Sequence, residues 1–227
     1  MSDRKISLSP SALNLFLECP CCFWYEKVKA IRRPRGIFPS LPGGMDRTIK
    51  AYFDVFRAKN TMPEELRLET FRGIRLFADQ EKLERWRNWR TGLVYRDDAT
   101  GAVLSGALDD LLVRDDRYIP LDYKTKGSPT TQEDAVKYYQ NQMDCYTLLL
   151  EASGLPPAGF AFLLYYSPKA VGEKGDVLFE VQPIRISTDA DRARATFRKA
   201  VKFLAEPSPP PGFCEYCVWR SKFENAD

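Results

Sequence analysis

Residues 103–125, VLSGALDDLLVRDDRYIPLDYKT, decide the fold of this chain. Two apolar or alternating runs, residues 103–113 and 118–124, stand on either side of the turn-forming pair Asp115-Asp116. A third short run, residues 93–96, precedes them and ends at the turn sequence DDATG, residues 97–101. Alternating runs of this length between turn residues are typical of antiparallel strands. The sequence therefore predicts an antiparallel meander of three strands at the centre of the chain.

Helical patterns surround this meander. Ser9 followed by Pro10 predicts a helix start, and apolar residues at helical spacing predict helices over residues 45–58, 133–152 and 189–204. Residues 160–166 and 177–186 predict two more strands, and residues 34–44, rich in Pro and Gly, predict a loop. This order predicts an α/β (α+β) fold with one mixed central sheet flanked by helices.

We expect residues 1–227 to form a single domain, because domains that contain a sheet commonly reach about 200–250 residues. Within it, residues 1–90 should be mainly helical, and residues 91–204 should form a core of sheet and helix. Residues 205–227 should form a Pro-rich linker and a tail that contains cysteines.

Composition narrows the possible functions. The chain has a formal net charge of +3, is 44% hydrophobic and 29% charged, and resembles an average globular protein in these respects. It has no apolar run long enough to span a membrane and no secretory leader, so we expect an intracellular, cytoplasmic protein without a membrane partner. Because the sequence contains 0 histidine residues, the chain cannot use an imidazole base or imidazole metal ligands. Carboxylates, carbonyls or thiolates must hold any metal.

The strands of the predicted meander carry aspartates and a lysine that we expect to lie close together. Asp122 and Lys124 are two positions apart on one strand and therefore share a face. If the turn pairs the two strands, Asp109 approaches Asp122, and the backbone carbonyl of Tyr123 lies beside them. Such oxygen donors suit Mg²⁺ or Mn²⁺, and Lys124 is placed to orient a water that the ion activates. The alternatives are a solvated strand face with an ordinary ion pair, and Asp110 in place of Asp109.

The cysteines form two C-x-x-C pairs near opposite ends of the chain. The four residues are Cys19, Cys22, Cys214 and Cys217. Four thiolates are the set that a tetrahedral zinc or an iron–sulfur cluster needs, and their spacing alone favours zinc. Cys21 and Cys145 are expected to be buried free thiols.

Basic residues also gather in two segments that predict local nucleic-acid contacts. They are Lys27, Lys29, Arg32, Arg33 and Arg35, and, interleaved with Trp86 and Trp89, Arg72, Arg75, Arg85, Arg87, Arg90 and Arg96. The alternative is a solvated helix with its apolar stripe in the core, which we favour for the two tryptophans.

The motifs G-A-L-D (residues 106–109), L-D-Y-K-T (residues 121–125) and Q-M-D-C-Y (residues 142–146) resemble, in this order, the PD-(D/E)XK nuclease superfamily. The best match within it is the RecB-like exonuclease group, which includes the CRISPR spacer-acquisition nucleases. The resemblance implies a restriction-endonuclease-like core, a metal site formed by Asp109, Asp122 and Lys124, and a strand-positioning role for Gln142 and Tyr146. It also implies DNA as the substrate, with cleavage at single strands or duplex ends, and a helicase or another DNA-processing subunit as a partner. The alternative is a non-catalytic module that binds nucleic acid or a helicase.

Two features depart from the family pattern. Many members carry a histidine on an early helix near the metal; here Asp46 or Lys50 falls in the corresponding part of the chain. Several RecB-like nucleases join their two ends through a 4Fe–4S cluster held by one early and three late cysteines. The third late cysteine would fall near Phe223, so Cys22 would replace it. The resemblance favours iron–sulfur at this site, and zinc is the alternative; in either case the metal would be structural.

Overall fold

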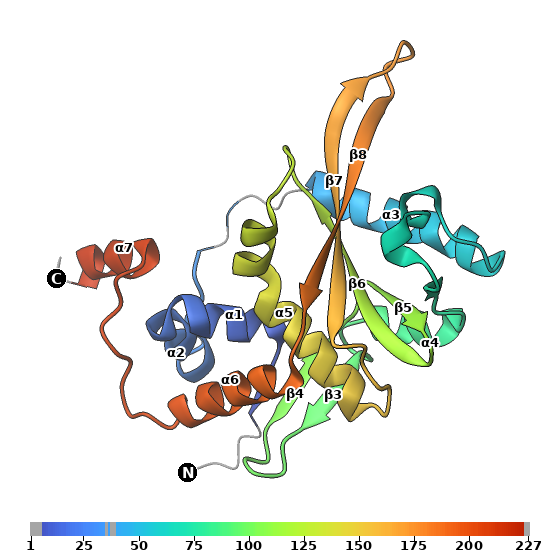
Figure 1. Cartoon of the computed structure of the whole chain (residues 1–227). Coiled ribbons are helices and arrows are strands. Elements are labelled where there is room, and N and C mark those ends of the chain that lie inside the picture. Colours follow the sequence, from blue (N-terminus) through green and yellow to red (C-terminus); the bar gives the residue numbers. More distant parts are fainter. Residues whose placement is uncertain (1–5, 35, 37–39, 225–227) are drawn as a thin grey trace.

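The computed structural model describes residues 6–34, 36 and 40–224 (Figure 1). Its helices are α1 (Pro10–Glu18), α2 (Pro20–Val28), α3 (Ser40–Ala58), α4 (Gln80–Arg87), α5 (Gln132–Ala152), α6 (Ala190–Phe203) and α7 (Glu215–Glu224), with 3₁₀ turns at Glu64–Leu66 and Glu69–Phe71. The strands are β1 (Ser7–Leu8), β2 (Arg75–Leu76), β3 (Leu93–Arg96), β4 (Val103–Gly106), β5 (Asp110–Arg114), β6 (Arg117–Thr125), β7 (Phe160–Val171) and β8 (Val177–Ser187).

The strands form two mixed sheets flanked by helices. The smaller sheet has the order β1-β4-β3, and the larger one has the order β2-β5-β6-β7-β8. In the larger sheet β6 and β7 are parallel and the other neighbours are antiparallel. The parallel pair needs a crossover, and α5 supplies it (Figure 1). The predicted α/β class is therefore confirmed, whereas the expected single sheet is two sheets.

The larger sheet buries both of its faces. Alternate residues of β7 enter two different clusters: Ala161 and Leu163 pack with α5 and α6, whereas Phe162 and Leu164 pack with Phe53 of α3 and other apolar residues. Side chains alternate across a strand, so one sheet between two helical layers gives this division. The layer formed by α5 also covers β3 and β4, and it thus joins the two sheets into one core.

The prediction of one strand over residues 103–113 is wrong, because this segment forms two strands, β4 and β5. The chain leaves the smaller sheet after Gly106 and enters the larger one at Asp110, so residues 107–109 connect two sheets and Asp109 lies just before β5 instead of inside a strand. A side chain at Gly106 would meet Leu149 Cδ1 at 2.8 Å and Pro10 Cγ at 3.3 Å. Close packing of α5 and α1 against this glycine accompanies the change of sheet, and the alternating pattern gives no sign of it.

Other boundaries also differ from the expectation. The predicted loop over residues 34–44 contains the start of α3 at Ser40, because Pro42 falls in the first helical turn, where proline is tolerated; residues 35 and 37–39 lie outside the described part. Strands β7 and β8 run further than predicted and form a long hairpin that projects beyond the sheet (Figure 1). Ser9 caps α1 as expected, with Oγ accepting a hydrogen bond from the Ala12 amide.

None of the helices in the described part of the chain is long and apolar enough to cross a membrane.

A buried ion network fastens α3 and α4 to the β5–β6 hairpin. Asp110 is fully buried and accepts hydrogen bonds from Arg57 Nη2 at 2.7 Å, Arg87 Nη2 at 3.1 Å and the Tyr123 hydroxyl at 2.6 Å. Arg87 also pairs with Asp54 at 2.7 Å. Since a buried charge is stable only when it is paired and hydrogen-bonded, the network constrains every element that contributes to it.

Replacing Asp110 with asparagine should lower the free energy of unfolding by about 3–5 kcal/mol, because it leaves the buried guanidinium groups without their counter-charge. Urea unfolding of Asp110→Asn against the wild type measures this change. The matched control is Asp98→Asn at an exposed turn, which should change the free energy by less than about 0.5 kcal/mol. Equal stability of both variants would contradict the role given to Asp110.

Candidate functional site

The register of the β5–β6 hairpin brings Asp109 to Asp122. Asp115 and Asp116 form the two-residue turn, both with positive φ (47° and 59°), as a type I′ turn requires. The last pair of the ladder is Asp110 with Leu121, so Asp109 lies next to Asp122. The Tyr123 amide donates a hydrogen bond to Asp109 Oδ2 at 3.3 Å. The predicted approach of the two carboxylates is therefore observed.

Asp122 is a buried carboxylate with an unusual environment. Its side chain is 1% exposed; Oδ1 accepts a hydrogen bond from Gln142 Nε2 at 3.1 Å, and Oδ2 forms an ion pair with Lys124. Among the described residues Oδ2 has no well-formed hydrogen bond besides that ion pair. Burial and the neighbouring Asp109 raise the pKa of Asp122 to about 7, although Lys124 opposes the shift. Such a group favours an additional cation.

Lys124 lies between Asp122 and helix α5. Its ammonium is 3.5 Å from Gln142 Oε1 and 4.5 Å from the centre of the Tyr139 ring. Burial lowers the pKa of Lys124, but attraction to Asp122 and Asp109 outweighs this effect and raises it overall. The side chain therefore carries a positive charge held in place by a carboxylate, an amide and an aromatic face. Sequence reasoning did not identify Tyr139, although it lies one helical turn before Gln142.

Gln142 and Tyr146 share one face of α5 and meet each other. Gln142 Nε2 donates to the Tyr146 hydroxyl at 2.7 Å as well as to Asp122. Tyr146 is 6% exposed, and burial together with Asp122 raises its pKa well above the ordinary value. Gln142 therefore contacts Asp122 directly, and Tyr146 contacts Gln142.

Asp109 contacts helix α3 through Lys50. Lys50 Nζ is 2.7 Å from Asp109 Oδ1 and 2.9 Å from Asp46 Oδ2. A pocket opens beside this pair, between α3 and the end of β6, and Asp46, Tyr123 and Lys124 contribute to its lining. Of the two neighbouring aspartates that the sequence left open, Asp109 faces this site and Asp110 belongs to the buried network.

The donor set at this edge suits a hard divalent ion. Two carboxylates lie side by side, and one of them has a buried and incompletely bonded oxygen. Mg²⁺ commonly binds through one or two carboxylates and takes its other ligands from water and substrate phosphates. The residues present therefore fit such an ion.

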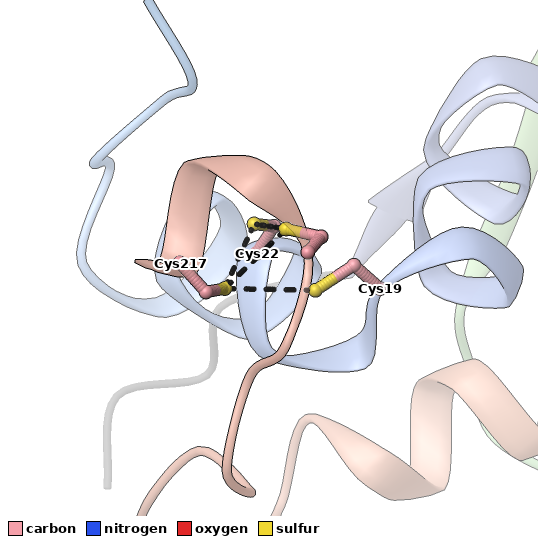
Figure 2. Close-up of side chains that lie close together, drawn as sticks. Cys19, Cys22 and Cys217 are labelled. Atoms are coloured by element: carbon pink, nitrogen blue, oxygen red, sulfur yellow. Dashed lines mark hydrogen bonds between the residues drawn. The ribbon is translucent and has the colours of Figure 1, made fainter. Parts of the chain in front are cut away.

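The four paired cysteines gather where α7 lies beside α2 (Figure 2). Their Sγ atoms all lie within 4.8 Å of one another. The separations are 3.7 Å for Cys19 to Cys217 and 3.5 Å for Cys22 to Cys214, Cys22 to Cys217 and Cys214 to Cys217. Within the described residues this is the one group of three or more acidic, histidine or cysteine ligands close enough to share an ion. Helices α2 and α7 therefore meet at a group of four thiols whose spacing fits a single metal ion.

The surroundings of this centre are basic and tightly packed. Arg33 donates to Cys214 Sγ at 3.6 Å and pairs with Glu18 at 2.7 Å. Burial raises the pKa of Cys214, but hydrogen bonds from the Cys217 amide and the neighbouring thiols lower it to about 6 overall. Thiolate is the form that binds metal. A side chain at Gly212 would lie 2.8 Å from Cys21 Sγ, so the approach of the tail requires glycine there.

The fold places members of the two basic segments in different environments. Arg87 pairs with Asp110 in the buried network, and Arg33 donates a hydrogen bond to Cys214 at the cysteine centre. Trp86 packs on Phe77 at the core, as favoured, whereas Trp89 is 71% exposed beneath the Arg90 guanidinium. Arg35 lies outside the described residues. Cys21 and Cys145 are buried, as expected for free thiols.

Comparison with known proteins agrees with the geometry of the carboxylate site. A family model described as the PD-(D/E)XK nuclease superfamily matches residues 35–221, which include both carboxylates, the lysine and the two residues of α5. A search of curated proteins finds no match. The family match spans well over half of the sequence and covers the whole carboxylate site. This chain belongs to the PD-(D/E)XK nuclease superfamily.

Proposed function

We propose that this protein is an Mg²⁺- or Mn²⁺-dependent deoxyribonuclease that hydrolyses phosphodiester bonds in single-stranded DNA or at DNA ends. The observation that carries the proposal is the buried Asp122, placed beside Asp109 and bound to Lys124, in a chain of a nuclease superfamily. A copy of the fold that only binds nucleic acid has no need to keep two adjacent carboxylates and a lysine in this costly environment.

In the proposed mechanism Asp109 and Asp122 would hold a divalent ion, with the backbone carbonyl of Tyr123 as the further ligand that the sequence predicts. The ion, when bound, neutralises charge on the phosphate and acidifies a water molecule. The Lys124 ammonium, kept in place by Asp122 and Gln142, orients the attacking water and opposes negative charge that develops on the phosphate. Asp110 takes no part because its oxygens are used by the arginines beneath the site.

Gln142 and Tyr146 act on the metal site in this proposal. Their hydrogen bonds connect Asp122 to the body of α5, so they orient the carboxylate. The strand-positioning role implied by the resemblance receives less support, because Tyr146 is buried and its hydroxyl accepts a hydrogen bond from Gln142.

We propose that the four cysteines hold one structural zinc ion. Thiolates bound at about 2.3 Å to one tetrahedral zinc stand about 3.8 Å apart, close to the separations of 3.5–3.7 Å between four of the Sγ pairs. A 4Fe–4S cluster places four irons between the thiolates and separates their sulfur atoms much further. The geometry therefore supports zinc over the iron–sulfur cluster that the resemblance favoured.

The domain organisation, the cellular location, the mode of cleavage and the biological process are further parts of the proposal. We propose that residues 1–227 act as one nuclease domain, that the protein works inside the cell where DNA is present, and that its cleavage is exonucleolytic, in DNA repair, recombination or CRISPR-type processing. Membership of the RecB-like group and a helicase partner remain predictions.

Asp122→Ala and Lys124→Ala should each lower DNA cleavage by about 10²-fold or more, because one removes a metal ligand and the other a water-orienting group. End-labelled single- and double-stranded DNA with Mg²⁺ or Mn²⁺ provides the assay. Gln142→Ala should lower the rate less, since Asp122 remains. Asp98→Ala and Lys199→Ala, at exposed positions away from the site, are the charge-matched controls. Wild-type rates in both site variants, or no cleavage by the wild type, would contradict the proposal.

Binding of Mn²⁺ should weaken as the pH falls below 7, because the pKa of Asp122 is about 7 and its proton must leave before the ion binds. Metal-free native protein keeps this proton at pH values where the unfolded chain, with the ordinary pKa of 3.8, has lost it. The contribution of Asp122 to metal-free stability therefore falls as the pH rises from about 4 to about 7. Calorimetric Mn²⁺ titrations across this range test the prediction, and a constant affinity would contradict it.

Purified protein should be colourless and contain about one zinc per chain at the cysteine centre. Cys214→Ser should lower the melting temperature strongly and expose the Pro-rich residues 206–212 to protease, because metal binding is then part of the folding free energy. Cys145→Ser, which removes a buried thiol outside the centre, is the matched control and should do far less. A brown protein with visible absorbance would indicate iron–sulfur instead, and a metal-free protein of unchanged stability would exclude a structural metal.

A further inference from the structure

Lys50 occupies a position that the proposed mechanism leaves unexplained. Its ammonium bridges Asp109 Oδ1 at 2.7 Å and Asp46 Oδ2 at 2.9 Å, and its side chain is 19% exposed. A lysine ammonium is charged at neutral pH, and here it is held between the two carboxylates. A permanent positive charge thus lies directly on one of the two carboxylates of the site.

This contact competes with the divalent ion. Asp109 Oδ2 already accepts the Tyr123 amide, and Oδ1 is the oxygen that Lys50 occupies. A divalent ion that binds Asp109 therefore approaches the ammonium of Lys50, and the two positive charges repel. The four-carbon stem of lysine lets the ammonium withdraw while Asp46 retains it near the site.

With a divalent ion bound, the net charge of the site favours an anion. With Asp122 ionised, as metal binding requires, Asp46, Asp109 and Asp122 face Lys50 and Lys124, which leaves one net negative charge. One divalent ion turns this into one net positive charge, and one phosphodiester group balances it. The pocket beside Asp46 and Lys124 lies where such a group would enter, between α3 and the end of β6.

We propose that Lys50 is a further catalytic residue, which holds Asp109 before metal binds, yields Asp109 Oδ1 to the ion, and then pairs with a non-bridging oxygen of the scissile phosphate. The inference rests on the proposed nuclease function. It gives the two lysines separate tasks: Lys124 acts beside Asp122 on the water, and Lys50 acts from α3 on the phosphate.

The experiment measures Mn²⁺ affinity and DNA cleavage of Lys50→Met in the full-length chain. Without the competing charge, the Kd for Mn²⁺ should fall by at least about tenfold. Without the phosphate contact, the cleavage rate at saturating Mn²⁺ should fall by about 10²-fold. These changes have opposite directions, whereas damage to the structure of the site would weaken both binding and cleavage.

Two further variants define the test. Lys50→Gln removes the charge but keeps a hydrogen-bond donor for the carboxylates, so it serves if the methionine variant does not fold. Lys59→Met, at an exposed position just after α3, is the matched control and should leave both quantities unchanged. Titration of the Asp122→Ala variant with Mn²⁺ measures any Mn²⁺ that binds outside the carboxylate site.

Unchanged or weaker Mn²⁺ binding in both Lys50 variants overturns the competition, and unchanged cleavage in them overturns the phosphate contact. The binding measurement does not depend on cleavage. A wild type that binds Mn²⁺ at Asp122, gains affinity on loss of Lys50 and cuts no DNA would therefore reject the proposed function while retaining the competition between Lys50 and the ion.

Discussion

The buried carboxylate of Asp110 is the contact on which the rest of the structure depends. It has no access to water, so it is stable only because Arg57, Arg87 and the Tyr123 hydroxyl surround it. These donors come from α3, from the end of α4 and from β6. The hydrogen bonds of one aspartate therefore connect two helices and a hairpin, and Tyr123, one of the donors, also packs against Phe53 in the apolar cluster of α3.

The same network determines how the site is built. Arg87 Nε donates to the backbone carbonyl of Asp109 at 2.8 Å, which fixes the residue directly before the buried aspartate. Because Tyr123 is drawn toward Asp110, alternation along β6 turns Asp122 and Lys124 to the opposite face, toward α5. An ion network on one face of the sheet thus sets the position of the Asp122–Lys124 ion pair on the other face, so Asp110 and Asp122 have different environments.

The sequence predicts those parts of this arrangement that depend on neighbours in the chain. The Asp115-Asp116 turn sets the register of the hairpin, and helical spacing places Gln142 and Tyr146 on one face of α5. The partners of Arg87 could not be predicted, since a basic residue next to tryptophans also suits a phosphate contact, and its acceptors Asp54 and Asp110 lie 33 and 23 positions away. The change of sheet after Gly106 was also missed, because it depends on packing between distant elements and leaves the alternating pattern intact.

The two candidate cation sites differ in chemistry as well as in place. The carboxylate site offers hard oxygen donors from β6 and the segment before β5, whereas the centre that joins α2 to α7 offers soft thiolates. Mg²⁺ and Mn²⁺ prefer the first set, and zinc or iron–sulfur prefers the second. Imidazole accepts zinc, copper, iron and nickel alike, and the chain contains 0 His. Without that intermediate ligand, the donors of the two candidate sites differ sharply in softness, which favours a different kind of ion at each.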